Sequence, residues 1–305
     1  MNHPSPATAS QSNVSSSESN SADIAPVIQR ISDTLGDVDQ RLDQIDRSDY
    51  AFDVSLIIPV FNERQTLPDV LARIDEVMPE STETIIVDDA STDGTSVWLA
   101  SLPERPNRKI VRRVRNHGKG SAVRLGIRHS RGRVVAIQDA DSEYDPKDLL
   151  TVIEPVLRGD AEVVYGSRYL EDIEDPSLLH RLGNWALTVT SNCMTGQSLT
   201  DMETCHKAFR GDLVRSIAIR ECRFGFEPEI TSKVAARGVQ ISEVPTGYNY
   251  RSYDEGKKIT WRDGLAAFAC MWRYRNPGWC GRAIGCFTGR SQSRDSDTPP
   301  STLNQ

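Results

Sequence analysis

The sequence predicts an α/β domain over residues 53–275, with a mostly parallel central sheet flanked by helices and an extra helix before it. Short apolar runs of strand length alternate there with segments whose apolar residues follow helical spacing. This alternation is typical of parallel sheets with right-handed helical crossovers. Polar and acidic residues also follow several of the apolar runs directly, and parallel sheets bind ligands beyond the carboxyl ends of their strands.

The elements follow one another in a regular order. Strands are predicted for the apolar runs at residues 54–60, 84–88, 109–115, 133–138 and 161–167. Helices are predicted where apolar residues recur every three or four positions, at residues 64–77, 91–102, 119–130 and 147–157.

The two ends of the chain have a different composition. Residues 1–22 and 291–305 are polar and almost free of large apolar side chains, so we expect them to be disordered. Residues 23–48 predict an amphipathic helix, because apolar residues from Ile24 to Ile45 recur at alternating steps of four and three. Two interpretations stay open, a coiled-coil homodimer through residues 24–45 or a helix that packs on its own domain.

Charge and composition exclude several classes of function. The formal net charge is −7, of which residues 1–53 carry −6, so we expect no overall basic surface for nucleic acid. No run approaches the roughly 18 apolar residues of a transmembrane helix. The six cysteines include no CxxC pair and no signal peptide precedes the domain, so a cytoplasmic protein with reduced thiols is expected.

The last part of the domain has a composition of its own. Residues 263–290 mix Trp and Phe with Arg, which is typical of a membrane–water interface. We therefore expect residues 276–290 to be a membrane-surface segment. A peripheral protein on the cytoplasmic face of the membrane and a wholly soluble one both remain open.

The most acidic strand end is "QDADSEYDP", residues 138–146. Asp139 and Asp141 are two residues apart in an extended backbone, so their side chains share one face. Two such carboxylates repel each other unless a cation lies between them or one is protonated. Mg²⁺ or Mn²⁺, which prefer oxygen ligands and bind diphosphate oxygens, fit this pair. Asp145, before Pro146, is instead expected to begin the next helix.

A glycine-rich stretch, "NHGKGSAVRLG", precedes the strand at 133–138. It lacks the GxxxxGK[ST] pattern of a phosphate loop and the third glycine of a dinucleotide-binding motif. Lys119 is nevertheless expected at the start of a helix, where its charge and the backbone N–H groups can bind an anion.

Taken together, the motifs resemble family-2 glycosyltransferases with the GT-A fold, closest to the polyprenyl-phosphate (dolichol-phosphate) mannosyl- and glucosyltransferase branch. The resemblance spans residues 53–275 and rests on Pro59-x-x-Asn62-Glu63, "VDDASTDGT", "NHGKGSAVRLG", "QDADSEYDP", "YGSR" and "LTDMETCHKAFR", in this order. It implies a Rossmann-like sheet and an inverting, metal-dependent transfer of a hexose from a GDP- or UDP-linked sugar.

The resemblance also implies the residues that bind the donor. The base and ribose would lie against Pro59, Phe61, Glu63, Val87 and Asp89. The remaining nucleotide, the diphosphate and the metal would be held by Lys119, Asp139, Ala140 and Asp141, with Glu143 as a third metal ligand.

The acceptor side is implied by the later motifs. Arg168 would lie near the donor sugar or the acceptor phosphate, and Arg251 and Lys257 would bind the diphosphate or the acceptor phosphate. Asp201 is the first candidate for a base or positioning carboxylate, followed by Glu203, whereas His206 is expected to be structural.

The identity of the acceptor decides whether a base is needed. A hydroxyl acceptor requires one, whereas a lipid phosphate is already anionic and needs only positive charges to orient it. Polyprenyl phosphate is the favoured acceptor. A saccharide hydroxyl, and a non-catalytic scaffold that only binds a nucleotide sugar, remain the alternatives.

Overall fold

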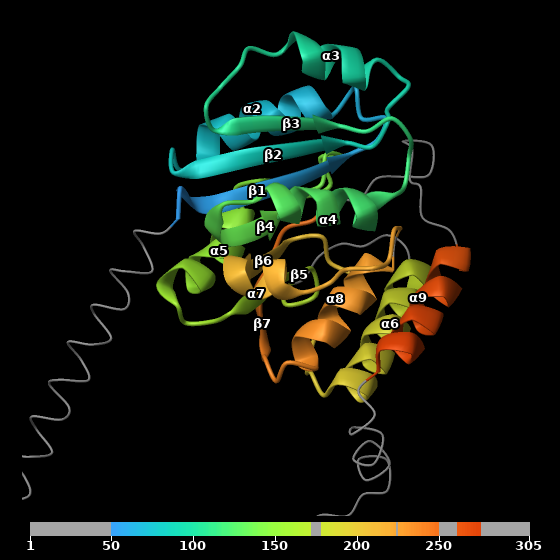
Figure 1. Cartoon of the computed structure of the whole chain (residues 1–305). Helices are drawn as coiled ribbons and strands as arrows, with labels where there is room; N and C mark the ends of the chain where they lie inside the picture. Colours follow the sequence, from blue (N-terminus) through green and yellow to red (C-terminus); the bar gives the residue numbers. More distant parts are fainter. Residues whose placement is uncertain (1–49, 172–177, 224, 250–260, 276–305) are drawn as a thin grey trace, which may run out of the picture. The chain divides into compact units, whose positions relative to one another are not determined.

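The computed structural model describes residues 50–171, 178–223, 225–249 and 261–275 (Figure 1). The chain divides into two units, residues 1–49 and residues 50–305. The predictions for residues 1–22 and for the helix at 23–48 lie outside the described residues. The same holds for the segments 276–290 and 291–305.

A seven-stranded sheet forms the centre of the described unit, in the order β3-β2-β1-β4-β6-β5-β7. The strands are β1 (Phe52–Val60), β2 (Thr82–Asp88), β3 (Arg108–Arg112), β4 (Gly132–Ile137), β5 (Val163–Ser167), β6 (Lys207–Arg210) and β7 (Ile241–Pro245). Only β6 runs antiparallel to its neighbours, β4 and β5. The predicted mostly parallel α/β sheet is therefore confirmed.

Helices separate most of the strands along the chain. They are α2 (Leu67–Val77), α3 (Thr95–Ser101), α4 (Lys119–His129), α5 (Leu149–Arg158), α6 (Leu178–Thr195), α7 (Gly211–Ser216), α8 (Phe226–Ala235) and α9 (Trp261–Tyr274). In the described part of the chain, none of these helices combines the length and the apolarity needed to cross a membrane.

The core consists of apolar clusters that lie on both faces of the sheet. Alternate residues of one strand point to opposite faces, so Ile58 packs with α2 and α5 whereas Ile57 packs with α4 and α8. Because both faces are covered, each of β1, β2 and β4 contains an unbroken apolar run, at residues 56–58, 85–87 and 134–137, as buried parallel strands do.

The predicted boundaries hold to within a few residues, with one instructive difference. The strand predicted at 109–115 ends at Arg112. Arg113 then turns its guanidinium toward Asp89, 3.1 Å away, and the chain leaves the sheet. The basic residues at 113 and 115 therefore belong to a loop at the carboxyl edge of the sheet.

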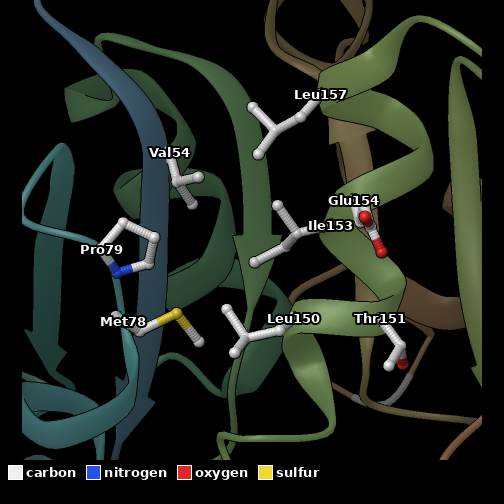
Figure 2. A pocket seen from close by; sticks show the side chains of 8 residues that line it. All are labelled: Val54, Met78, Pro79, Leu150, Thr151, Ile153, Glu154 and Leu157. Carbon is white, nitrogen blue, oxygen red and sulfur yellow. The ribbon is translucent and has the colours of Figure 1, made fainter.

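Figure 2 shows a pocket beside α5 that is separate from this edge. It is lined by Val54, Met78, Pro79, Leu150, Thr151, Ile153, Glu154 and Leu157. Val54 lies near the start of β1, so the pocket is at the opposite end of the strands from the acidic turns. Its lining is mostly apolar, which does not suit a nucleotide diphosphate.

Candidate active site

The polar strand ends of the described residues converge on one edge of the sheet. Val60 of β1 pairs with Asp88 of β2, and Ile57 pairs with Ile137 of β4, so these three strands end side by side. The antiparallel strand β6 begins at this edge, because Lys207 pairs with Ile137. The loop before β6 therefore reaches the same place as the loops after β1, β2 and β4.

The turns after β1 and β2 hold each other in place. Asn62, in the left-handed region with φ of 57°, accepts a hydrogen bond from the Thr92 amide at 2.8 Å. The Asn62 amide donates to Ser91 Oγ at 2.9 Å, and the Arg64 amide donates to Asp93 at 3.0 Å. These bonds make one rigid platform of the two motifs that were expected to hold the nucleoside.

The residues expected on this platform differ in accessibility. Pro59, Phe61 and Glu63 are half-buried at the edge. Ala140 is buried, and its carbonyl oxygen accepts a hydrogen bond from the Thr66 hydroxyl at 2.7 Å. The side chain of Val87 is fully buried in the core and supports the platform from below, and its assignment to the nucleotide site stays a prediction.

Asp89 is buried and already engaged with its own chain. Its Oδ2 accepts hydrogen bonds from the amides of His117 at 2.9 Å and Gly118 at 2.6 Å. Arg113 pairs with Oδ1 at 3.1 Å. The carboxylate thus orders the 113–118 loop beside the site. A direct bond from it to a base or ribose stays a prediction.

Lys119 is the centre of a charged cluster at the start of α4. Its Nζ lies 3.0 Å from Asp139, 3.3 Å from Glu227 and 2.9 Å from Cys205 Sγ. Burial alone would lower the pKa of Lys119, but Asp139, Cys205 and Glu227 raise it well above its usual value. The ammonium is therefore charged and points toward the acidic turn after β4.

The backbone at the start of α4 departs from the sequence prediction. The amides of Gly120 and Ser121 donate to the carbonyl oxygens of Arg223 and Cys222, at 3.3 and 3.1 Å. Gly118 has φ of 91°, and a Cβ there would lie 2.5 Å from the Cys222 oxygen, which explains the glycine. The expectation that these N–H groups bind an anion is wrong for Gly120 and Ser121. At the start of α4, the group that can bind an anion is therefore the side chain of Lys119.

The acidic turn after β4 concentrates negative charge. Burial, followed by the charges of Asp139 and Glu143, raises the pKa of Asp141 to about 7. Burial opposes ionisation of Asp139 too, but Lys119 outweighs it and lowers the pKa of that carboxyl. A divalent cation at Asp141 would relieve the repulsion between these carboxylates, so the negative charge of the turn suits such an ion.

The geometry of the turn fits the predicted ligand set less well. Among the described residues, no three His, Cys, Asp or Glu side chains converge as a metal site. Glu143 donates its amide to Asp141 at 3.1 Å, and its carboxylate is hydrogen-bonded to Tyr248, a residue the sequence did not single out. The assignment of Asp139, Asp141 and Glu143 as metal ligands stays a prediction.

Arg168 and Asp201 form a buried, bidentate ion pair. The Nε and Nη2 atoms of Arg168 lie 2.6 and 2.8 Å from the two carboxylate oxygens. Asn184 of α6 adds a hydrogen bond to Oδ1 at 3.1 Å. Burial would raise the pKa of Asp201, but Arg168 outweighs it and the pKa is lowered. A carboxylate held in this way is a weak base and a strong positioning group for Arg168.

Two aromatic rings border the guanidinium of Arg168. Its Cζ lies 5.0 Å from the ring centre of Tyr248 and 5.6 Å from that of Tyr169, within range of cation–π attraction. Tyr248 also packs against Tyr144, with ring centres 5.1 Å apart. The acidic turn after β4 and the segment after β7 are thereby joined around Arg168. Arg251 and Lys257, which follow in the chain, lie outside the described residues.

His206 is fully buried between two strand ends. Its Nε2 lies 3.0 Å from Gln138 Oε1, and its Nδ1 lies 2.9 Å from the Thr246 hydroxyl. The Gln138 amide nitrogen donates to two carbonyl oxygens, so Nε2 carries the proton and Nδ1 accepts from Thr246. Burial lowers the pKa of His206 to about 3, so the ring is neutral and has the structural role that was expected.

Glu203, which is half-buried, and Glu227, which is buried, form an acidic pair beside Lys207. Burial, followed by the charge of Glu227, raises the pKa of Glu203 to about 8. Glu203 Oε1 and Glu227 Oε2 have no hydrogen-bond partner among the described residues. Lys207 donates to the carbonyl oxygens of Met202 and Thr204, and so holds the loop that carries Glu203.

We expect Glu203→Gln to flatten the dependence of stability on pH. Because the folded-state pKa of Glu203 is raised to about 8, the wild type loses stability as pH rises from the unfolded-state pKa through about 8, and the loss through this group then levels off. The variant should match the wild type near pH 5 and melt several degrees higher at pH 9. Thermal melts at both pH values, with the exposed Glu104→Gln as control, check this, and parallel curves for Glu203→Gln and the wild type would contradict it.

This arrangement identifies the class of protein. A mostly parallel sheet with one reversed strand, and with acidic and cationic side chains at its carboxyl edge, has the organisation of GT-A-type glycosyltransferases. The family model described as glycosyl transferase family 2 matches residues 55–217, just over half of the chain. The chain belongs to this family and is a glycosyltransferase.

Similar proteins agree with this family. An undecaprenyl-phosphate mannosyltransferase of Micrococcus luteus is 34% identical over 214 residues, which cover 67% of this chain and 86% of that protein. A dolichol-phosphate mannosyltransferase of Pyrococcus furiosus is 28% identical over 67% of this chain, which spans 58% of the relative.

A solved structure supports the fold independently. Glucosyl-3-phosphoglycerate synthase of Mycobacterium tuberculosis, in complex with Mn²⁺, UDP-glucose and phosphoglyceric acid, superposes with a TM-score of 0.57. The two share 18% identity, and the match covers 78% of this chain and 82% of that one. At this identity the likeness establishes the GT-A fold alone.

Proposed function

We propose that this glycosyltransferase moves a hexose from a GDP- or UDP-linked sugar to the phosphate of a polyprenyl phosphate, with inversion and with Mg²⁺ or Mn²⁺. The observation that carries the choice of acceptor is the Arg168–Asp201 pair. A hydroxyl acceptor needs a general base. Asp201, the first candidate for a base, has a lowered pKa, and both of its carboxylate oxygens are hydrogen-bonded to Arg168. An anionic phosphate acceptor needs no base.

On this proposal the donor lies across the carboxyl ends of β1, β2 and β4. The base and ribose rest on the platform of Pro59, Phe61 and Glu63. The diphosphate extends toward Lys119 and the acidic turn, where Asp139 and Asp141 would hold the cation. When bound, a divalent cation supplies positive charge to the departing diphosphate, which is stabilisation that grows toward the transition state.

The reaction is a single displacement on this proposal. An oxygen of the acceptor phosphate forms a bond to the anomeric carbon while the bond to the diphosphate breaks on the opposite side, which inverts the configuration. No proton has to be removed. Arg168 would orient the acceptor phosphate or the sugar, with Asp201 and Asn184 fixing the guanidinium. Arg251 and Lys257 remain candidates for binding either phosphate.

The lipid acceptor also gives the proposed location. We place the protein in the cytoplasm, peripherally on the cytoplasmic face of a membrane, because nucleotide sugars are soluble and a polyprenyl chain is not. The names of the two polyprenyl-phosphate relatives support this acceptor class. Dimerisation through residues 24–45 stays a separate prediction.

Nucleotide binding should be visible as thermal stabilisation. We expect either GDP or UDP with Mn²⁺ to raise the melting temperature, since a ligand at 100 times its Kd adds about 2.7 kcal/mol. That is about 5–10 °C for a domain of this size. A panel of nucleoside diphosphates with and without metal measures it. Equal, negligible shifts for all of them would contradict the proposed donor site.

The acceptor is tested by direct competition. Wild-type protein is given a labelled nucleotide sugar with a polyprenyl phosphate and a free saccharide together, and the label is partitioned between organic solvent and water. We expect the label in the organic phase, in an acid-labile sugar phosphate. Label on the saccharide would identify the hydroxyl acceptor instead, and release of free sugar alone would exclude both.

A further inference from the structure

Helix α6 buries several polar side chains and exposes two large apolar ones. A surface helix normally buries an apolar stripe and exposes polar residues. In α6 the buried positions include Asn184, Thr188, Ser191 and Thr195, whereas Leu182 is 57% exposed and Trp185 is 61% exposed. Both the burial of these polar side chains and the exposure of the apolar ones need an explanation.

The buried polar face has a clear reason in the site. Asn184 donates to Asp201 at 3.1 Å, and the hydroxyl of Thr188 accepts from the Met202 amide at 3.1 Å. Asn192 binds the backbone of Leu199 at both its amide and its carbonyl. This face of α6 therefore fixes the loop that carries Asp201. Leu187 and Met194 pack against the core, whereas Leu182 and Trp185 are left largely exposed on the other side of the helix.

The neighbouring helix α9 adds to the exposed apolar surface. The two helices contact each other and lie side by side in Figure 1. On α9, Phe268 is 37% exposed and Trp272, one turn further on, is 60% exposed. We call Leu182, Trp185, Phe268 and Trp272 the α6–α9 surface. Other large apolar side chains that are highly exposed, such as Val97 and Val114, lie in separate segments.

Arginines outnumber carboxylates in the sequences of α6 and α9 and the residue after α9, where Arg181, Arg262, Arg273 and Arg275 stand against Asp263. α6 contains no Asp or Glu, although the whole chain has a net charge of −7. Arg181 is exposed on α6, and the guanidinium of Arg275 lies 4.0 Å from the ring centre of Trp272. Arg273 is paired with Glu221 at 2.8 Å, so it adds less. Trp and Phe together with Arg suit the headgroup region of a bilayer, and anionic lipids attract the arginines.

We propose that the α6–α9 surface docks on an anionic lipid bilayer. A second copy of the chain would also cover apolar side chains, but it would not account for the absence of acidic residues from α6. The inference rests on the proposed function in one respect, namely that the proposed acceptor is a lipid and lies in a membrane. Docking on this surface places α6 between the membrane and the Arg168–Asp201 pair, because α6 carries Asn184 on the side of Asp201 and Trp185 on its exposed side, so the pair lies at most about one helix diameter, roughly 10 Å, from the membrane.

The first experiment measures co-sedimentation of the full chain with vesicles of phosphatidylcholine, with or without phosphatidylglycerol. We expect strong binding to the anionic vesicles and weak binding to the neutral ones. The double variant Trp185→Ser/Trp272→Ser should bind anionic vesicles at least tenfold more weakly. The control Val97→Ser/Val114→Ser removes two exposed apolar side chains elsewhere and should bind like the wild type. Equal binding by both double variants would overturn the proposal.

Two further measurements separate the outcomes. Light scattering reports the oligomeric state, and a wild-type dimer that the tryptophan variant converts to a monomer would make the α6–α9 surface an interface between copies and overturn the proposal. Transfer to a short, water-soluble isoprenoid phosphate tests catalysis without vesicles. The tryptophan variant should retain it while losing transfer to long-chain acceptor in vesicles. If the wild type transfers sugar to neither the short nor the long-chain acceptor, the proposed function is wrong. The co-sedimentation with vesicles still tests the docking in that case.

Discussion

Replacing Asp141 with asparagine is expected to lower the rate of sugar transfer about a thousandfold and to leave the fold intact. Asp141 lies beside Asp139 and Glu143 at the end of β4, where the proposed cation would neutralise the departing diphosphate. Loss of a metal ligand removes several kcal/mol of transition-state stabilisation, and about 4 kcal/mol corresponds to a factor of 10³. The folded protein loses one of three neighbouring negative charges, so it should not be destabilised.

Steady-state transfer at saturating donor, together with thermal melts, measures both halves of this prediction. Asp160→Asn is a suitable control, because Asp160 is an exposed aspartate in the turn after α5 and remote from the acidic edge. The Asp141 variant should also lose the extra stabilisation that metal adds to bound nucleotide. Transfer within tenfold of the wild type would contradict the role of the acidic turn in binding the cation.

The Asp201→Asn variant is expected to be destabilised by about 3–5 kcal/mol, the effect of removing one partner from a buried ion pair. Arg168 would be left buried with a neutral amide in place of two charge-assisted hydrogen bonds. Transfer should fall as well, because the guanidinium loses the contact that orients it. Denaturant unfolding and transfer rates at a temperature where the variant is folded measure the two effects.

A double variant separates the structural part of this effect from the catalytic part. Arg168→Met/Asp201→Leu removes both charges, and replacing a buried pair with apolar residues is often neutral for stability. We expect it to recover most of the lost stability but not the transfer. Glu154→Gln breaks the exposed pair with Arg158 on α5 and should cost less than about 1 kcal/mol. A loss of less than 1 kcal/mol in Asp201→Asn would contradict the account of the pair.

Hydrophobic periodicity predicted the first half of the fold well, for a physical reason. The strands β1, β2 and β4 are buried on both faces, so each contains a short unbroken apolar run that marks it in the sequence. The reversed strand β6 was not predicted, because it has only four residues and begins with a buried lysine. Helix α6 was not predicted either, since its buried face is polar and periodicity cannot show which face is covered.

The candidate site also contains residues that could be predicted from the sequence and residues that could not. The acidic turn after β4 was predictable, because carboxylates that directly follow a buried strand must lie at the edge of the sheet. Asn184, Tyr248 and Gln138 were missed. Each acts through a partner on a distant segment, as Asn184 does on Asp201, and such pairs are defined only when the chain is folded.

The reversed direction of β6 has a consequence for how such a site can diversify. The proposed donor side is built from loops that follow β1, β2 and β4, whereas the segment carrying Asp201 and Glu203 precedes β6. Insertions in the long connection between β5 and β6 therefore alter one wall of the site without changing the register of the strands that form the other. A lineage with this topology can exchange one substrate while retaining the other.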